Sequence, residues 1–257
     1  MLSTEPFTSL RAVQGALNRT NEYLLSFSEE KQMPNHGFED VSKEISLLSI
    51  ENSKIEVEGF RKLLLLADTA NKLLVFLKKN KDRYPNLNEA SGGLAPVKEI
   101  PTEITRIIDK FGEVKDRASD QLYSIRRQMN GVRSKIGQSF GAALSTYQGS
   151  GFLDEIRETV MGNRRVLAVK AMYRRKVKGV IHGSSKTGSI VYIEPETTLQ
   201  YTQELQNLVY DEKEEVDAIL RALTDFMRPF SNDFFQLAAF LTLIDTHAAK
   251  AHYAKDM

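Results

Sequence analysis

The stretch EIRETVMGNRRVLAVKAMYRRKVKGVIHGSSKTGSIVYIEP, residues 155–195, decides how this chain folds. It is the one place where the spacing of apolar residues changes from helical to strand-like. It is rich in β-branched and aromatic residues, and turn residues at Gly162-Asn163, Gly179, Gly183 and Gly188 divide it into short runs. This pattern predicts a short antiparallel meander. Helical patterns flank it on both sides, so the predicted fold is mainly α with a small antiparallel β insert.

The same stretch carries charge of one sign. Between Thr159 and Ile193 it holds eight lysines and arginines and no acid, whereas the whole chain balances 35 Lys and Arg against 34 Asp and Glu. Such a local field attracts a polyanion backbone, largely without sequence readout. The simpler alternative is that the charges only prevent edge-to-edge pairing of the sheet. The candidate nucleic-acid contacts are Arg164, Arg165, Lys170, Arg174, Arg175, Lys176, Lys178 and Lys186, with Arg174, Arg175, Lys176 and Lys186 favoured because they fall in predicted turns.

The motif from Gly183 to Gly188 (GSSKTG) superficially resembles a phosphate-binding loop. That loop needs a glycine directly before its lysine and leads from a strand into a helix. Here Ser185 precedes Lys186, and strand-like residues follow. We interpret the motif as a β-hairpin turn with glycine at positions that need a positive φ.

The histidines give little support for chemistry. His182 has no Ser–His–Asp arrangement beside it, and the surrounding stretch holds no acid to orient its ring, so a packing or phosphate-contacting role is favoured. His247 and His252 are five residues apart, which is off the i, i+4 spacing of a shared ligand face. We predict no catalytic residue, no metal site and no cofactor in this chain, and therefore no enzyme activity of its own.

Two long helices are predicted on either side of the basic stretch. Ser119-Asp120 caps the first, and its apolar residues recur at spacings of three and four, as in a coiled coil. They are Leu122, Ile125, Met129, Val132, Ile136, Phe140, Ala143 and Tyr147. The second helix runs from Thr197 to the stop at Pro229, with Tyr201, Leu205, Leu208, Val216, Ile219, Leu223, Phe226 and Met227 as its seam. Two seams of equal length predict an antiparallel helical hairpin with the β insert at its far end.

The other segments read as a helical bundle. Helices are expected at residues 7–33, 39–50, 56–80 and 232–256. Residues 84–102 contain three prolines and a Gly-Gly pair and are read as a loop. Pro101-Thr102-Glu103 then opens a helix whose apolar face is Ile104, Ile107, Ile108 and Phe111.

Composition excludes several classes of protein. The absence of cysteine excludes disulfides and cysteine-based metal sites and fits a reducing compartment. No apolar run approaches the ~20 residues that span a bilayer, and the first residues lack the pattern of a signal peptide. We therefore expect a cytoplasmic location and no membrane partner.

The order of these motifs resembles the core, lever and clamp region of MutS-type proteins, specifically of their second bacterial branch. The G-x-x-x-Y/F-I-E-P phrase ahead of a long acidic and apolar helix is its most specific part. The resemblance covers roughly residues 60–257. It is carried by 111–119 (FGEVKDRAS), 122–127 (LYSIRR), 163–170 (NRRVLAVK), 177–182 (VKGVIH), 187–195 (TGSIVYIEP) and the helix 205–219.

The resemblance implies a bundle core, two antiparallel lever helices and a β clamp that closes on DNA. ATP and Mg²⁺ would bind a separate C-terminal domain, which this chain lacks together with the nuclease module of that branch. We therefore expect a DNA-binding fragment of an ATPase, one that forms a homodimer at full length and can also carry nuclease activity. The expected domains are a helical core (1–118), an outgoing lever (119–152), the clamp (153–196), a returning lever (197–228) and a core helix (229–257).

The predicted function is contact with the phosphate backbone of duplex or branched DNA, in a recombination or mismatch-repair setting. The alternative, from another class, is a helical interaction or dimerisation module that docks on the ribosome or its rRNA. Exposure of Tyr201, Leu205 and Leu208 in a monomer would favour that alternative.

Overall fold

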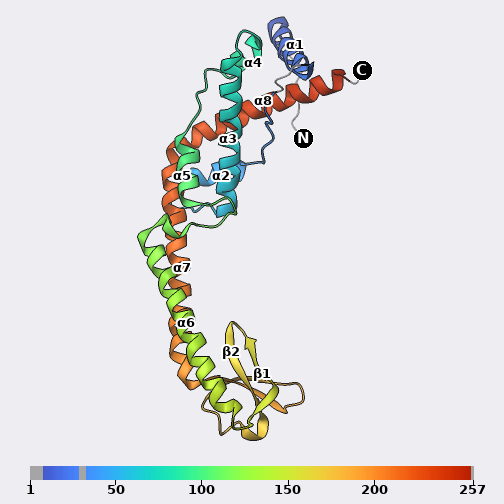
Figure 1. Ribbon diagram of the computed structural model, residues 1–257. Helices are drawn as coiled ribbons and strands as arrows, with labels where there is room; N and C mark the ends of the chain where they lie inside the picture. The colour runs from blue at the N-terminus through green and yellow to red at the C-terminus, as the bar shows by residue number, and fades with distance from the viewer. Residues whose placement is uncertain (1–7, 29–32, 256–257) are drawn as a thin grey trace. The chain divides into compact units, whose positions relative to one another are not determined.

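The computed structural model describes residues 8–28 and 33–255, and it is mainly helical with one small antiparallel sheet, as predicted (Figure 1). The chain forms two compact units, Met1–Lys115 with Ala218–Met257, and Asp116–Asp217. Helix α7 (Glu196–Met227) gives its first part to the second of these units and its last residues to the first. Within the described ranges no helix is long and apolar enough to cross a membrane.

The first unit is a helical bundle in which α3 and α8 pack against each other. Helix α1 packs on α8 and α4, α2 packs on α3 and α8, and α5 packs on α3. Fully buried side chains such as Phe60, Leu73 and Phe234 form its core. The helices are α1 (Leu10–Leu25), α2 (Ser42–Leu48), α3 (Val57–Lys79), α4 (Pro85–Ala90), α5 (Glu99–Ile107) and α8 (Ser231–Lys255), with the short 3₁₀ turns η1 (Ser26–Ser28) and η4 (Arg228–Phe230).

These helices confirm most of the predicted segments, with shorter bounds. The predicted helix 7–33 is α1 followed by η1, and residues 7 and 29–32 lie outside the described part of the chain. The predicted helices 39–50, 56–80 and 232–256 correspond to α2, α3 and α8. Helix α8 is described up to Lys255. In α3 the side chains of Leu65 and Val75 are exposed, so the helix buries one broad face and leaves the other open to solvent.

Two predictions in the first unit are wrong. Residues 85–90 form the helix α4, because Pro85 suits its first position and the buried Glu22 carboxylate accepts bonds from the N–H groups of Asn86 and Leu87 at 2.9 and 2.8 Å. Phe111 does not extend the apolar face of α5: the helix ends at Ile107 and the Phe111 side chain is 74% exposed.

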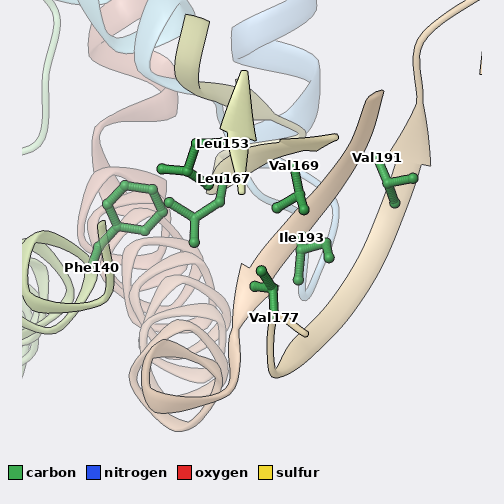
Figure 2. Packing of buried hydrophobic residues seen from close by; sticks show 7 residues of the cluster. All are labelled: Phe140, Leu153, Leu167, Val169, Val177, Val191 and Ile193. Carbon is green, nitrogen blue, oxygen red and sulfur yellow. The ribbon is translucent and has the colours of Figure 1, made fainter. Parts of the chain in front are cut away.

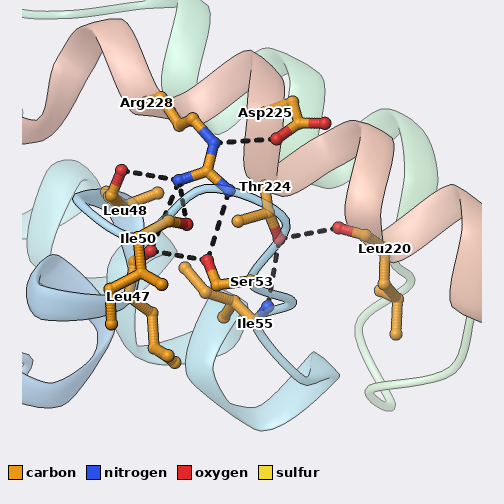
Figure 3. Close-up of polar contacts among 9 residues, drawn as sticks. All are labelled: Leu47, Leu48, Ile50, Ser53, Ile55, Leu220, Thr224, Asp225 and Arg228. Carbon is orange, nitrogen blue, oxygen red and sulfur yellow. Dashed lines mark hydrogen bonds and ion pairs between the residues drawn. The ribbon is translucent and has the colours of Figure 1, made fainter.

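The end of α7 is tied to the segment between α2 and α3 by polar contacts (Figure 3). The Arg228 guanidinium donates to the carbonyls of Leu48 and Ile50 at 2.8 and 2.6 Å, and its Nε donates to Asp225 at 2.7 Å. The Thr224 hydroxyl accepts the N–H of Ile55 at 3.0 Å and donates to Leu220 O at 2.7 Å. Carbonyls left free after α2 are therefore satisfied by one charged side chain.

In the second unit, α6 (Asp120–Gln148) and the first part of α7 form the predicted antiparallel hairpin. A short 3₁₀ turn, η2 (Asp116–Ala118), precedes α6, and the Ser119 hydroxyl accepts the N–H of Leu122, as expected of a helix cap. The pairing is antiparallel because Ser119 bonds to Glu215 near the start of α6, whereas Ser139, further along, bonds to the carbonyl of Thr197. The seam between the helices buries Ile125, Met129, Val132 and Leu208, with Ile136, Tyr201 and Leu205 partly buried against them.

The β insert is antiparallel throughout, but it is not the simple meander that the sequence predicts. Its strands are β1 (Leu153–Met161), β2 (Arg164–Lys170), β3 (Gly179–Ser184) and β4 (Ile190–Pro195), in the spatial order β1-β2-β4-β3. Strand β4 therefore lies in the middle beside β2, with Leu167 opposite Ile193. The β2–β3 connection, residues 171–178, reaches the far edge and includes the 3₁₀ turn η3 (Ala171–Tyr173).

One face of the sheet packs on α6 near the end of the helical hairpin (Figure 2). Alternating residues of β2 and β4 point to this side, as the period of two in a strand requires. They enclose the fully buried ring of Phe140 from α6. The cluster is Phe140, Leu153, Leu167, Val169, Val177, Val191 and Ile193.

Candidate nucleic-acid interface

The β2–β3 connection is a structured turn and not a loose loop. The Tyr173 ring stacks on Phe152 with centroids 4.8 Å apart, and Val177 is buried in the sheet core. The Ala171 N–H donates to the carbonyl of Ser189 at 2.8 Å, which joins the connection to the β3–β4 hairpin. The two segments that carry most of the predicted contact residues are therefore held side by side.

Six of the eight predicted cations are exposed, and across the described ranges none of the six makes an ion pair. Lys170 ends β2, and Lys186 lies in the turn between β3 and β4. No acidic side chain among the described residues neutralises these exposed charges, and a phosphate backbone can bind them at little desolvation cost. The six are Lys170, Arg174, Arg175, Lys176, Lys178 and Lys186.

The remaining two cations are half-buried and paired within the sheet. Arg165 donates to Glu158 at 2.6 Å across the β1–β2 hairpin, and its guanidinium lies 4.3 Å from the centroid of Phe140. Arg164 donates to Glu194 at 2.9 Å. The charges of Arg164 and Arg165 are therefore partly balanced inside the fold.

Glu194 is the centre of a small charged cluster. Its carboxylate is 1% exposed, and its Oε2 accepts from Arg164 and lies 2.7 Å from Nε2 of His182. Its other oxygen, Oε1, is buried with no hydrogen-bond partner in the described part of the chain. The expectation that no acid orients His182 is thus wrong. The acid-free interval ends at Ile193, and the next residue, Glu194, supplies the carboxylate.

The motif from Gly183 to Gly188 is a hairpin turn, as predicted. Strands β3 and β4 pair antiparallel on either side of it, and the Ser185 N–H donates to the carbonyl of Ile190 at 2.9 Å. Gly188 has a φ of +72°, which glycine adopts without strain. Gly183 does not have a positive φ, because it is part of strand β3, so that part of the prediction is wrong. Three hydroxyls meet in this turn beside exposed Lys186: Thr187 and Ser189 are 2.8 Å apart, and Ser185 is 3.3 Å from Thr187.

A cavity of about 360 Å³ lies where α6, the start of α7 and Lys178 meet, and no motif in the sequence predicted it. The Lys178 N–H donates to the Tyr147 hydroxyl at 3.1 Å on its wall. The wall is mostly apolar with a few hydroxyls, and its two charged residues are Lys178 and Glu196. It is lined by Ser139, Ala142, Ala143, Thr146, Tyr147, Lys178, Pro195, Glu196 and Thr197.

The described residues contain no cluster of three or more His, Asp or Glu side chains that could hold a metal ion. His247 is buried in the first unit, where Arg19 Nε lies 3.1 Å from its Nε2 and the Thr20 hydroxyl lies 2.9 Å from its Nδ1. Burial, helped by the charges of Arg19 and Lys250, lowers the pKa of His247 to about 4. His252 is exposed, and its ring contacts Phe27 at a tilt of 38°, with centroids 4.5 Å apart.

Comparisons with known proteins point in one direction. The chain is 30% identical, over its whole length, to a protein described as Endonuclease MutS2 from Lactobacillus helveticus. It is 27% identical over 98% of its length to an Endonuclease MutS2 from Clostridium botulinum, and 30% identical over 68% of its length to one from Halothermothrix orenii. No protein-family model matches the chain.

The matched region is one part of a longer protein in each case. The chain covers 33% of the Lactobacillus protein, 32% of the Clostridium protein and 22% of the Halothermothrix protein. It thus spans a third or less of the length of the curated relatives that it matches.

Proposed function

The chain is MutS-like and is related to the MutS2 proteins along its whole length, and from this premise we propose that it contacts the phosphate backbone of duplex or branched DNA. The contact is made by the β sheet of the second unit, which serves as a clamp, while α6 and α7 serve as its levers. The proposed parts are the helical core (1–118), the outgoing lever (119–152), the clamp (153–196), the returning lever (197–228) and the last core helix (229–257).

The observation that carries this proposal is the separation of the eight cations into two groups. Six are exposed and unpaired among the described residues: five lie on the β2–β3 connection and the adjoining hairpin turn, and Lys170 lies at the end of β2. Arg164 and Arg165 are held by Glu194 and Glu158. We therefore assign phosphate contact to Lys170, Arg174, Arg175, Lys176, Lys178 and Lys186, and an internal structural role to Arg164 and Arg165.

The rest of the proposal concerns the longer protein. ATP and Mg²⁺ bind in a part of the relatives that this chain does not cover. Any nuclease activity also belongs to a part outside this chain. The chain itself acts by binding, in recombination or mismatch-repair-related DNA transactions, and the full-length protein is a homodimer.

The experiment that tests DNA contact is a salt titration of binding by a charge-reversed variant. Replacing Arg174, Arg175, Lys176 and Lys186 with Glu removes four candidate phosphate contacts. The slope of log affinity against log salt should become shallower by about 3 to 4, because each phosphate contact contributes about 0.9. Unchanged affinity and slope for a linear duplex and a branched junction would refute the proposal.

The matched control reverses four exposed lysines of the first unit, Lys43, Lys72, Lys81 and Lys98, and so changes net charge equally. This control should keep most of the wild-type salt slope, because its charges lie outside the proposed interface. Far-UV circular dichroism of both variants checks that each is folded. A competition with ribosomal RNA belongs in the same series, and preference for that RNA over DNA would favour the ribosome alternative.

The alternative of dimerisation through the helical seam has less support. Leu208 is buried, and Tyr201 and Leu205 are partly buried, against Ile125, Met129 and Val132 of α6 in the same chain. Those side chains are already used within one molecule.

A further inference from the structure

Met172 is the most exposed large apolar side chain among the described residues of the second unit, with 78% of its surface open. It lies in η3, at the beginning of the β2–β3 connection. Contact with the phosphate backbone does not account for it, because a thioether side chain has no charge and only weak hydrogen-bonding capacity.

The fold holds Met172 in place from both sides. The Ala171 N–H is bonded to the carbonyl of Ser189, and the ring of Tyr173 stacks on Phe152. Two further bonds close the turn, from the Arg174 N–H to the carbonyl of Ala171 and from the Lys176 N–H to the carbonyl of Tyr173. The apolar side chain is therefore presented on a pre-ordered turn, so that little backbone entropy is lost when a ligand covers it.

The surroundings of Met172 select the chemistry of that ligand. Arg174, Arg175 and Lys176 follow it directly, all three exposed, and across the described ranges none of them makes an ion pair. An apolar protein partner would have to desolvate these charges. A polyanion pairs with them and still offers apolar surface between its stacked bases.

We propose that Met172 is a wedge that enters the minor groove of duplex DNA and partly unstacks one base step, while Arg174, Arg175 and Lys176 hold the flanking phosphates. This inference rests on the proposed function and adds a mode of engagement to it. Methionine is among the apolar residues that insert between base steps, and arginine is favoured in narrow minor grooves by their negative potential. The bound duplex is kinked at the wedge.

The test measures bending and affinity separately on the full 257-residue chain. A duplex of about two helical turns, labelled with a donor and an acceptor at its ends, reports a kink as a rise in energy transfer, because wedges of this kind bend DNA by about 20–90°. Three variants are compared with the wild type: Met172→Ala, Met172→Gln and the triple variant Arg174→Glu/Arg175→Glu/Lys176→Glu. The matched control is Val160→Ala, because Val160 in strand β1 is also an exposed apolar residue, with 65% of its surface open.

Met172→Ala and Met172→Gln should abolish most of the rise in energy transfer and weaken binding about fivefold, with the salt slope unchanged, because no phosphate contact is lost. Val160→Ala should behave as the wild type. Wild-type bending and affinity in both Met172 variants, with binding lost in the triple variant, would overturn the wedge and leave the proposed function intact. Wild-type binding by the triple variant would overturn both.

Discussion

Nη1 of Arg164 lies 2.9 Å from Oε2 of Glu194, a carboxylate that is 1% exposed. Breaking such a buried pair costs about 3–5 kcal/mol, because the remaining charge loses its partner. We expect Arg164→Ala to lower the free energy of unfolding by about 3 kcal/mol, the smaller end of that range, since His182 still contacts the same oxygen. Urea denaturation followed by circular dichroism measures this loss.

The matched control for Arg164 is Lys170, an exposed cation on the same strand. Lys170→Ala should change the free energy of unfolding by no more than about 0.5 kcal/mol, as is usual for surface sites. Lys170→Ala should instead make the salt dependence of DNA binding shallower. Arg164→Ala should leave that salt dependence unchanged. The reverse pattern would show that Arg164 is a phosphate contact.

Gly179 and Gly188 both have positive φ values, +157° and +72°, but their surroundings differ. A Cβ on Gly179 would lie 2.0 Å from the carbonyl oxygen of Glu194, whereas one on Gly188 would meet nothing within 4 Å. Gly179→Ala should therefore cost at least about 4 kcal/mol of unfolding free energy through backbone displacement. Gly188→Ala should cost about 1–2 kcal/mol, the penalty of the left-handed conformation alone.

Thermal unfolding of the two glycine variants provides the comparison, with the wild type measured at the same concentration. Equal losses in both would mean that β3 can move away from β4 without penalty. That result would contradict the tight pairing of Gly179 with Pro195 at the end of the sheet.

Arg228 satisfies carbonyls at the end of α2 and pairs with Asp225. Arg228→Ala should lower the free energy of unfolding by about 2–3 kcal/mol, because charged hydrogen bonds are lost and the carbonyls are left unsatisfied. Arg228→Lys should recover only part of this, since an ammonium group cannot reproduce the fork of a guanidinium. Arg221→Ala, at an exposed arginine of the preceding helix α7, is the control and should be nearly neutral.

The helices of the second unit were predictable because their signals are local. Ser119 is followed by apolar residues at spacings of three and four, and the buried seam from Leu122 to Ala143 reproduces that pattern. A capped helix with one apolar stripe has few ways to bury it. The glycine turns at Gly162-Asn163 and Gly188 were readable for the same reason.

The features that could not be predicted from the sequence depend on contacts between residues far apart in the chain. Helix α4 begins where it does because Glu22, more than sixty residues earlier, caps it. The position of β4 between β2 and β3 follows from pairing energies across the whole sheet, which no short window contains. The separation of the eight cations into six exposed and two paired residues has the same origin. Glu158 and Glu194 lie just outside the acid-free interval, and only the strand register brings them to Arg165 and Arg164.

The buried His247 should make the stability of the fold depend on pH. Its neutral ring fits one tautomer, in which Nε2 accepts from Arg19 and Nδ1–H donates to Thr20, whose hydroxyl donates to the carbonyl of Ala16. Protonation would place an N–H against the Arg19 donor, which agrees with the lowering of its pKa from 6.5 to about 4. Because the folded pKa lies below the unfolded one, the unfolded chain binds more protons between these values.

The stability due to neutral His247 is therefore complete above about pH 6.5 and falls as the pH drops toward 4, by at most about 3 kcal/mol. Urea midpoints measured from pH 5 to pH 7.5, where most carboxylates stay ionised, should rise with pH in the wild type. His247→Gln should flatten this rise, whereas His252→Gln, at an exposed ring, should leave it unchanged. A His247→Gln variant with the wild-type pH slope would show that other groups cause the dependence.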